Sequence, residues 1–332
     1  MNKKKILITG GCGYVGSLLV DTLRKKNYSI TVLDTLWFGK NLPKDKSIKF
    51  IKEDIRNTDK INLKGFNTVI HLANISNDPS AQIDPNISWE INVLASYQLL
   101  IKAKKSGVKK FIYASSGSVY GIKKEKKVTE NLSLIPITTY NKTKLIFEKL
   151  LMSTSSKDFK TYCLRPGTIC GHSPRTRFDL SVNILTLSAL KNKVIKVFGG
   201  SQFRPHIHIK DMIRVYEHFL TKNISSGIYN TSNECFTINK LAKFVQKRTE
   251  SKLVYYKSND IRSYRLNADK LLRTGFSFKY KVEDAINELI YLYSKNKLKD
   301  NLNSYNLKKM QKLINLKKIK LNIKIKIFQK KY

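Results

Sequence analysis

Acidic residues are scarce in this sequence. Its 332 residues hold 24 aspartates and glutamates against 63 lysines and arginines, which leaves a formal net charge of +39. An imbalance of this size is typical of proteins that bind nucleic acid or an anionic membrane surface. The charge is mostly lysine, however, and is spread along the chain without an aromatic-interleaved basic stripe or a helix-turn-helix pattern. We therefore favour a solvated basic surface and predict no nucleic-acid partner.

Cysteine and long apolar segments are also scarce. The cysteines form no CxxC pair and have no histidine partner at metal-ligand spacing: Cys12, Cys163, Cys170 and Cys235. They indicate reduced thiols in a cytoplasmic protein and no metal site. No apolar run approaches the ~18 residues that span a bilayer. Too few apolar residues follow the N-terminal lysines for a signal peptide.

Glycine is infrequent, yet after the first apolar run, residues 6–8, three glycines recur at three-residue spacing: Gly10, Gly13 and Gly16. They precede an amphipathic segment, residues 17–24, so the order strand, glycine turn, helix is predicted. Gly10 would form the tight turn, Gly13 would let a pyrophosphate approach the backbone, and Gly16 would let the helix pack against the strand. The phosphates would then lie at the helix N-terminus, where free N–H groups favour negative charge.

An acidic residue follows this loop at the spacing that a dinucleotide site requires. Asp34 ends the next apolar run, residues 30–33, about 20 residues after Gly16. A carboxylate there binds the adenosine ribose hydroxyls and repels a 2′-phosphate. The glycines alone also fit a purely structural turn, but together with Asp34 they predict a dinucleotide site for NAD rather than NADP.

Strand-like apolar runs alternate with helix-period segments over the first half of the chain. The predicted strands are residues 6–9, 30–34, 48–52, 68–72, 110–115 and 161–165. Predicted helices include residues 86–105, which Gly107 would end, and residues 139–152. This alternation predicts an α/β fold with a doubly wound parallel sheet of the Rossmann type.

After Gly171 the pattern loosens, and we predict a smaller C-terminal substrate domain interleaved with the first. Helices are predicted at residues 180–190, 238–248 and 284–293, and strands at residues 194–198 and 227–231. The NAD-binding domain would hold residues 1–171 with a returning segment at about 204–232. The substrate domain would hold residues 172–203 and 233–300.

Residues 301–332 hold ten lysines and no acidic residue, and we interpret them as an appendage to the fold. Within them, residues 321–327 alternate between apolar and polar like a strand. We favour a compositional bias without function as the explanation. The next alternative is a weak association with an anionic membrane surface, because the lysines are interleaved with apolar residues.

Tyr140 and Lys144 are four residues apart on the predicted helix 139–152 and share one face. An ammonium group beside a phenol lowers the tyrosine pKa from its usual value of about 10, so Tyr140 could act as a base. Upstream, the strand 110–115 ends in Ser115 and Ser116, at the sheet edge where open α/β sheets bind ligands. We predict that Ser116 hydrogen-bonds the oxygen that Tyr140 deprotonates. Taken separately, a chance pair and a serine-rich turn would explain these residues too.

With these motifs in order, residues 3–296 resemble the extended short-chain dehydrogenase/reductase family, in its nucleotide-sugar epimerase and dehydratase branch, and specifically its UDP-glucose 4-epimerase-like members. The resemblance implies NAD as the cofactor and Asp34 as the ribose acid. It implies a cofactor loop at Gly10, Gly13, Tyr14, Val15 and Gly16. Further cofactor-site positions would be Asp54, Ile55, Leu72, Ala73, Ser115 and Asn92, the last with a structural role. The catalytic residues would be Ser116, Tyr140 and Lys144, the last two also contacting the cofactor. Substrate contacts would be Ser116, Thr168, Arg177, Arg204 and Arg262.

Departures from the family narrow the implied chemistry. The 4,6-dehydratases carry Asp-Glu directly after the catalytic hydroxyl, where this sequence has Gly117 and Ser118, so dehydration lacks its acid and base. Ser118 also replaces the Glu of related decarboxylases and the Cys of 3,5-epimerases. Thr168 replaces the usual substrate-binding asparagine. Residues 173–180 look more like a subgroup from bacterial surface-polysaccharide clusters, which includes nucleotide-heptose 4-dehydrogenases.

The resemblance therefore implies an NAD-dependent nucleotide-sugar oxidoreductase that transfers a hydride at sugar C4. The favoured activity is 4-epimerisation of a nucleoside-diphosphate sugar for surface-polysaccharide biosynthesis. One alternative is a hexose or heptose 4-dehydrogenase that releases the 4-keto sugar, and another is a non-catalytic NAD-sensing protein. Family members often dimerise through the helices predicted here at residues 86–105 and 139–152, so a homodimer is expected.

Overall fold

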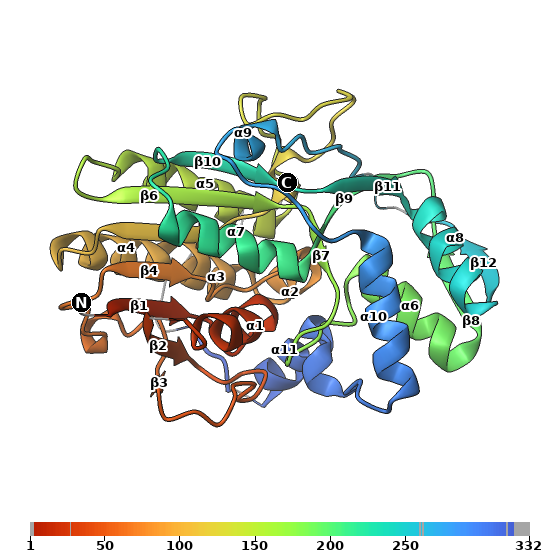
Figure 1. Cartoon of the computed structure of the whole chain (residues 1–332), viewed down its shortest axis with the longest axis horizontal. Coiled ribbons are helices and arrows are strands. Elements are labelled where there is room, and N and C mark those ends of the chain that lie inside the picture. The colour runs from red at the N-terminus through yellow and green to blue at the C-terminus, as the bar shows by residue number, and fades with distance from the viewer. Residues whose placement is uncertain (1–2, 27, 259, 261, 317, 322–332) are drawn as a thin grey trace.

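A seven-stranded parallel sheet forms the centre of the molecule (Figure 1). The computed structural model describes residues 3–26, 28–258, 260, 262–316 and 318–321. The strand order is β10-β6-β5-β4-β1-β2-β3. The strands are β1 (Lys4–Thr9), β2 (Tyr28–Asp34), β3 (Ile48–Lys52), β4 (Thr68–His71), β5 (Lys110–Ala114), β6 (Lys160–Pro166) and β10 (Gly227–Thr231). The predicted doubly wound α/β fold is confirmed, and the six strands predicted in the first half lie within two residues of their expected bounds.

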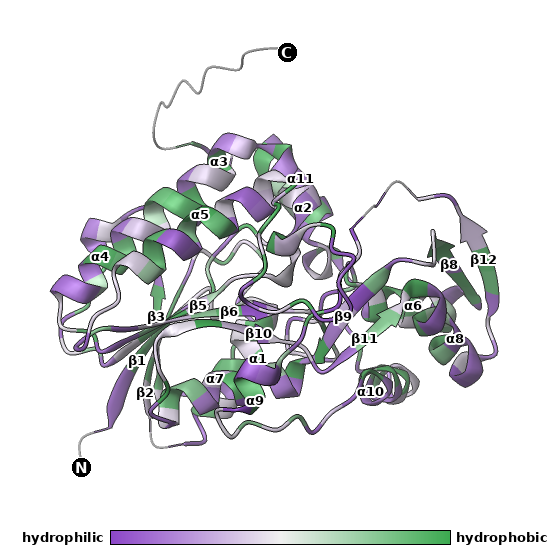
Figure 2. Cartoon of the chain, turned by 90° about the horizontal axis from the view of Figure 1, so that it is seen from above, coloured by the Kyte–Doolittle hydropathy of each residue, from purple (hydrophilic) through white to green (hydrophobic). Residues whose placement is uncertain are grey.

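Separate sets of helices cover the two faces of this sheet (Figure 2). One face carries α2 (Asp78–Ile83), α3 (Pro85–Trp89), α4 (Ser96–Lys105) and α5 (Thr139–Ser153). The other carries α1 (Tyr14–Leu23), α7 (Ile209–Thr221) and α9 (Asp269–Leu272). The neighbouring β5 residues Phe111 and Ile112 are fully buried in the two different cores, because side chains alternate along a strand. Burial on both faces explains the continuous apolar runs of the sequence.

The predicted helix at residues 86–105 is present but is not a uniform α-helix. A π-helical segment, Glu90–Ala95, separates α3 from α4. Such segments are rare and often lie beside functional sites. Here the segment carries Asn92, whose contacts are described with the site below.

A second lobe packs beside the carboxyl edge of the sheet. It contains α6 (Ser181–Asn192), α8 (Ile238–Thr249), α10 (Val282–Ser294) and a parallel pair of strands, β8 (Val194–Phe198) and β12 (Lys252–Tyr256). A small sheet joins it to the first lobe through β7 (Thr168–Cys170), β9 (Phe203–His208) and β11 (Glu234–Thr237). The helices and strands predicted in this part are present. The residue boundaries of the two domains stay a prediction.

The C-terminal segment corrects the sequence interpretation. Residues 301–316 do not form an appendage: after a 3-10 turn, Leu302–Ser304, the helix α11 (Asn306–Asn315) packs against α2. Met310 is 2% exposed and belongs to the same core as Phe111. The expectation of an appendage was wrong because it rested on the lysine content and overlooked the helix-period apolar residues of α11. The predicted strand at 321–327 lies, apart from residue 321, outside the described residues. No helix among the described residues is long and apolar enough to cross a membrane.

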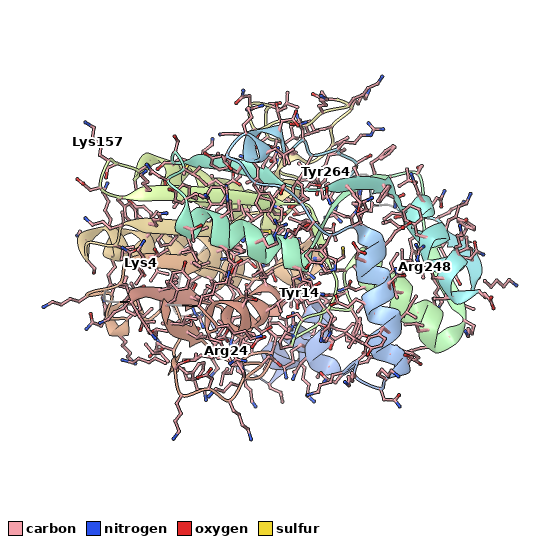
Figure 3. All side chains as sticks on the ribbon, viewed as in Figure 1. Lys4, Tyr14, Arg24, Lys157, Arg248 and Tyr264 are labelled. Carbon is pink, nitrogen blue, oxygen red and sulfur yellow. The ribbon has the colours of Figure 1, made fainter. Side chains whose placement is uncertain are left out.

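Lysine side chains such as Lys4 and Lys157 project from the surface, in agreement with a solvated basic exterior (Figure 3). Apolar side chains are exposed on the helices expected to dimerise. Leu94, Tyr97 and Ile146 are 37%, 38% and 38% exposed. A dimer through these helices would cover them. It stays a prediction, which analytical ultracentrifugation would check.

Candidate active site

A cleft of about 800 Å³ lies at the carboxyl edge of the parallel sheet. The loops after β1, β2, β4, β5 and β6 form one wall, and residues of α6 and β8 from the second lobe contribute to the other. Open α/β sheets bind their ligands at this edge. Every site residue predicted from the sequence lines the cleft except Asn92.

The turn from β1 into α1 leaves no room for a side chain at Gly10 or Gly16. Gly10 has a φ of +70°, and a Cβ there would lie 2.6 Å from the Ala73 backbone nitrogen. A Cβ on Gly16 would collide with the Gly10 carbonyl oxygen. The loop therefore brings bare backbone and the N-terminus of α1 to the cleft, an arrangement that suits the pyrophosphate of a dinucleotide. Tyr14, labelled in Figure 3, is buried: its hydroxyl donates to the Gly171 carbonyl at 2.7 Å and accepts from Asn183 of α6 at 3.3 Å, which joins the two lobes.

Asp34, at the end of β2, is held in place by backbone donors. The Cys12 N–H donates to its Oδ2 at 2.9 Å and the Leu36 N–H to its Oδ1 at 2.7 Å. Burial raises the pKa of Asp34, while these two hydrogen bonds act in the opposite direction. A fixed acceptor carboxylate at the cleft wall fits the ribose hydroxyls of NAD. Four further predicted cofactor positions line the same region: Asp54, Ile55, Leu72 and Ala73.

Asn92 is fully buried and does not line the cleft. Its Oδ1 accepts from the Ile75 N–H at 2.8 Å, and its Nδ2 donates to the Ile75 carbonyl at 3.1 Å. The same Nδ2 donates to Thr143 Oγ1 at 3.2 Å. Asn92 thus ties the loop after β4 to α5, directly beside Lys144. This position agrees with the structural role that the resemblance implies, and Asn92 is a positioning residue rather than part of the cleft lining.

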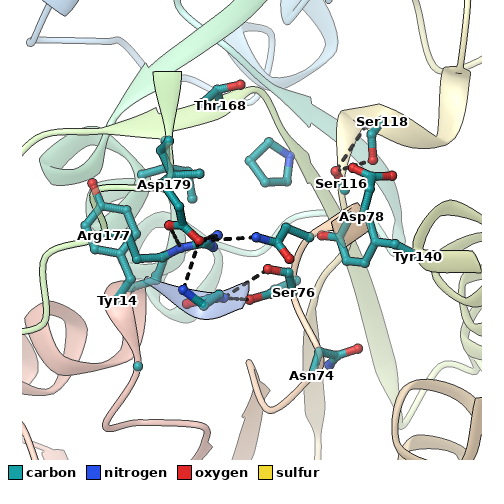
Figure 4. Close-up of a pocket in the computed structure, with 18 of the residues that line it drawn as sticks. Tyr14, Asn74, Ser76, Asp78, Ser116, Ser118, Tyr140, Thr168, Arg177 and Asp179 are labelled. Carbon is teal, nitrogen blue, oxygen red and sulfur yellow. Dashed lines mark hydrogen bonds and ion pairs between the residues drawn. The ribbon is translucent and has the colours of Figure 1, made fainter. Parts of the chain in front are cut away.

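The predicted catalytic residues converge at one end of the cleft, where Figure 4 shows Ser116 and Tyr140 close together. Burial raises the pKa of Tyr140, and the charge of Asp78 adds to the rise. A hydrogen bond with Ser116 and the charge of Arg177 lower that pKa. Ser116 Oγ lies 2.8 Å from Ser118 Oγ and caps the short helix Gly117–Tyr120. The protein surroundings therefore keep Tyr140 protonated unless further positive charge approaches it.

Lys144 lies beneath Tyr140 on α5. Its Nζ is 5.6 Å from the centroid of the Tyr140 ring and donates to the Ala114 carbonyl at 2.7 Å. Burial lowers the pKa of Lys144 to about 7. The predicted shared face of Tyr140 and Lys144 is thus present.

Ser115 lines the cleft, but its hydroxyl turns into the protein and donates to Glu148. Glu148 also accepts from Arg165, with Nη2 at 2.6 Å and Nε at 3.0 Å. Both charged side chains are almost fully buried. This pair fixes α5, which carries Tyr140 and Lys144, against β5 and β6.

Arg204 and Arg262, which both line the cleft, meet on a shared carboxylate. Each donates from Nη2 to Asp260 Oδ2 at 2.7 Å. Arg262 also pairs with Asp78, the carboxylate that acts on Tyr140. Two guanidinium groups so placed can bind the diphosphate of a nucleotide sugar. The sequence analysis missed Asp78 and Asp260, because neither belongs to a recognised motif and Asp78 is 184 positions from Arg262.

Arg177 is 8% exposed and lies across the cleft from Tyr140 (Figure 4). Its Nε donates to Asp179 Oδ1 at 2.8 Å. Thr168, at the start of β7, lines the cleft between these two sides. Sequence reasoning missed two other lining residues, Arg175 and Asn306, although the pattern Arg-Thr-Arg offered a weak signal for the first.

Comparison with known proteins agrees with this geometry. Residues 6–232 match the model of the NAD dependent epimerase/dehydratase family. A putative UDP-glucose 4-epimerase from Methanocaldococcus jannaschii is 31% identical over 245 residues, which cover 70% of this chain and 80% of the relative. A UDP-glucose 4-epimerase from Lactobacillus helveticus is 29% identical over 252 residues, which cover 68% of this chain and 76% of the relative.

Solved structures are similar over most of the chain. The UDP-glucose 4-epimerase of Thermotoga maritima, solved with UDP-glucose, superposes with a TM-score of 0.81 at 25% identity over 88% of this chain and 99% of that one. The UDP-N-acetylglucosamine 4-epimerase of Methanobrevibacter ruminantium, solved with UDP-N-acetylmuramic acid, gives a TM-score of 0.80 at 25% identity over 89% of this chain and 100% of that one. Both matches confirm the Rossmann-type fold.

Proposed function

Since the chain belongs to the NAD-dependent epimerase/dehydratase family, and is thus an extended short-chain dehydrogenase/reductase, we propose that it is a nucleotide-sugar 4-epimerase with NAD as its cofactor. The observation that carries the proposal is the convergence of Ser116, Tyr140 and Lys144 in one cleft with the arginine pair Arg204 and Arg262. The first group suits oxidation of a carbinol and the second suits a diphosphate.

The cofactor half of the cleft fits NAD in three respects. Bare backbone at the glycine loop accepts a pyrophosphate, Asp34 accepts from ribose hydroxyls, and Lys144 lies on the side of Tyr140 where it can contact the second ribose. When bound, NAD would supply a nicotinamide ring that accepts the hydride and returns it. The positive charge of the oxidised ring would also favour the phenolate of Tyr140.

The protein residues then have separate tasks. Tyr140 removes the proton from the sugar 4-hydroxyl, and Ser116 holds that oxygen by a hydrogen bond. Lys144 favours the phenolate form of Tyr140. Arg204 and Arg262 bind the diphosphate while the 4-keto sugar turns to present its other face. Tyr140 finally returns the proton.

The identity of the nucleotide and sugar is part of the proposal. UDP-sugars are favoured because the named relatives are UDP-glucose 4-epimerases. Thr168, in the position of the usual asparagine, supports a sugar held differently from glucose, and it keeps a nucleotide-sugar 4-dehydrogenase as the second candidate. A role in surface-polysaccharide synthesis remains a proposal from the resemblance of residues 173–180.

The decisive experiment incubates the protein with a panel of UDP-, GDP- and ADP-sugars, with and without added NAD, and follows the products by NMR. A 4-epimer formed without net NAD consumption supports the proposal. A 4-keto sugar formed with stoichiometric NADH would replace it with the dehydrogenase. NAD binding without turnover of any sugar would favour a sensing protein.

Cofactor choice is a direct test of Asp34. NAD should bind at least about tenfold more tightly than NADP, since a 2′-phosphate beside a carboxylate costs about 1.4 kcal/mol or more. In Asp34→Asn this preference should shrink. The control Glu53→Gln, which alters another carboxylate lining the cleft, should keep it. Calorimetry measures all three proteins, and equal affinities in wild type would remove Asp34 from the ribose.

A further inference from the structure

The arginines of the cleft differ in what neutralises them. Arg177 pairs with Asp179 at 2.8 Å, and Arg204 and Arg262 pair with Asp260 at 2.7 Å. Arg175 lines the same cleft and is only 5% exposed. Within the described part of the chain, no carboxylate lies within 4.0 Å of its guanidinium.

The groups that do hold Arg175 are neutral. Its Nε donates to the Asn303 carbonyl at 2.9 Å and its Nη2 to Asn306 Oδ1 at 2.6 Å. Its guanidinium carbon lies 4.2 Å from the centroid of the Phe38 ring. Burial and the charge of Arg177 lower the pKa of Arg175 to about 9. A buried cation without a carboxylate is costly, and its cost falls when a ligand brings the missing anion.

The position of Arg175 indicates which anion this is. Phe38, which contacts the Arg175 guanidinium, follows β2, whose last residue is Asp34. The Arg175 backbone N–H donates to Ser173 Oγ at 3.4 Å, and the Ser173 hydroxyl donates at 2.6 Å to the carbonyl of Tyr14, the first residue of α1. Arg175 therefore lies between the ribose acid and the N-terminus of α1, which is the region where the cofactor loop accepts phosphate.

We propose that Arg175 binds the pyrophosphate of the dinucleotide and that the C-terminal segment, residues 303–306, holds it for this contact. This inference rests on the proposed function for the identity of the dinucleotide. It makes the C-terminal segment a part of the cofactor site, although it lies beyond the residues that match the family model.

Asn306 is the centre of this arrangement. Its N–H donates to Asp179 Oδ2 at 3.0 Å, and its Nδ2 donates to Ser76 Oγ at 3.0 Å and to the Ser76 carbonyl at 3.1 Å. Asn77 Nδ2 donates to the same Asp179 oxygen at 3.2 Å. One residue at the start of α11 thus links the loop after β4, the Arg175–Asp179 loop and the cleft. Met310 and Leu313, buried in the core, anchor the helix behind it.

Calorimetry on the full chain tests the proposal with ligands that each occupy a different part of the cleft. Arg175→Gln should raise the Kd of NAD and of ADP-ribose at least about tenfold, the value of a charge-assisted hydrogen bond, and leave adenosine and UDP close to wild type. Asn306→Asp should weaken NAD and ADP-ribose too, because the new carboxylate would pair with Arg175. Lys312→Gln, which removes a charge from the exposed side of α11, should change none of the four.

Three results would overturn the inference and leave the proposed function standing. The first is an unchanged affinity of Arg175→Gln for ADP-ribose. The second is an equal loss of affinity for adenosine, which would assign Arg175 to packing of Phe38. The third is a loss of affinity for UDP alone, which would assign Arg175 to the substrate diphosphate. Circular dichroism and thermal melting confirm that each variant is folded. A wild-type protein that binds no NAD would contradict the proposed function instead.

Discussion

Tyr140→Phe should lower turnover by a factor of about 10²–10⁴, the usual loss when an acid–base group is removed, and leave NAD binding unchanged. The substitution removes only the hydroxyl that moves the proton. The ring keeps its place above Lys144. Steady-state kinetics on the active nucleotide sugar and calorimetry with NAD measure the two quantities.

The matched control is Tyr113→Phe. Tyr113 is another buried tyrosine near Lys144, whose Nζ lies 4.7 Å from its ring, but its hydroxyl makes only a 3.5 Å contact with Asn74. Turnover of the Tyr113→Phe variant should stay near that of wild type. The pH profile adds a second readout. Turnover of wild type should rise with pH as phenolate forms and fall where Lys144 loses its proton, since burial raises the pKa of Tyr140 and lowers that of Lys144 to about 7. This pH dependence should vanish in Tyr140→Phe. Near wild-type turnover in that variant would remove Tyr140 from the mechanism.

The largest expected change in stability comes from Arg165. Arg165→Leu should lower the free energy of unfolding by about 3–5 kcal/mol, because it leaves Glu148 buried without its cation. Arg165 is 1% exposed, and it also donates to the Tyr120 hydroxyl at 2.8 Å. Urea unfolding followed by circular dichroism measures the loss.

The double variant Glu148→Leu with Arg165→Leu should recover most of that loss, since an apolar pair of similar size leaves no charge buried. Lys191→Gln, which breaks the exposed ion pair with Asp300, serves as the control and should change stability far less. If Arg165→Leu cost no more than Lys191→Gln, the buried pair would not support α5.

Local spacing determined the cofactor loop and the catalytic helix. Gly10, Gly13 and Gly16 sit where a strand turns into a helix, and Tyr140 and Lys144 share a helix face, so the chemistry is readable within a few residues. The strands of the sheet could also be predicted from the sequence, because burial on both faces leaves an unbroken apolar run.

The Arg175–Asn306 contact is an example of an interaction that residue spacing in the sequence cannot predict. The two residues are 131 positions apart, and no local pattern connects them. The contacts of Asn92 are a second case: its partners, Ile75 and Thr143, lie on other elements, and only these contacts show how it positions α5.

The C-terminal segment shows most clearly the difference between what the sequence determines and what only the tertiary structure decides. Its sequence determined a strong positive charge and, in Leu307, Met310 and Leu313, the apolar face of a helix. Which surface that face covers depends on the shape left by α2 and the loops at the sheet edge, and this exists only in the folded chain. The tertiary structure therefore decided that Asn306 faces the cleft, because helix packing follows from complementary surfaces that sequence periodicity does not encode.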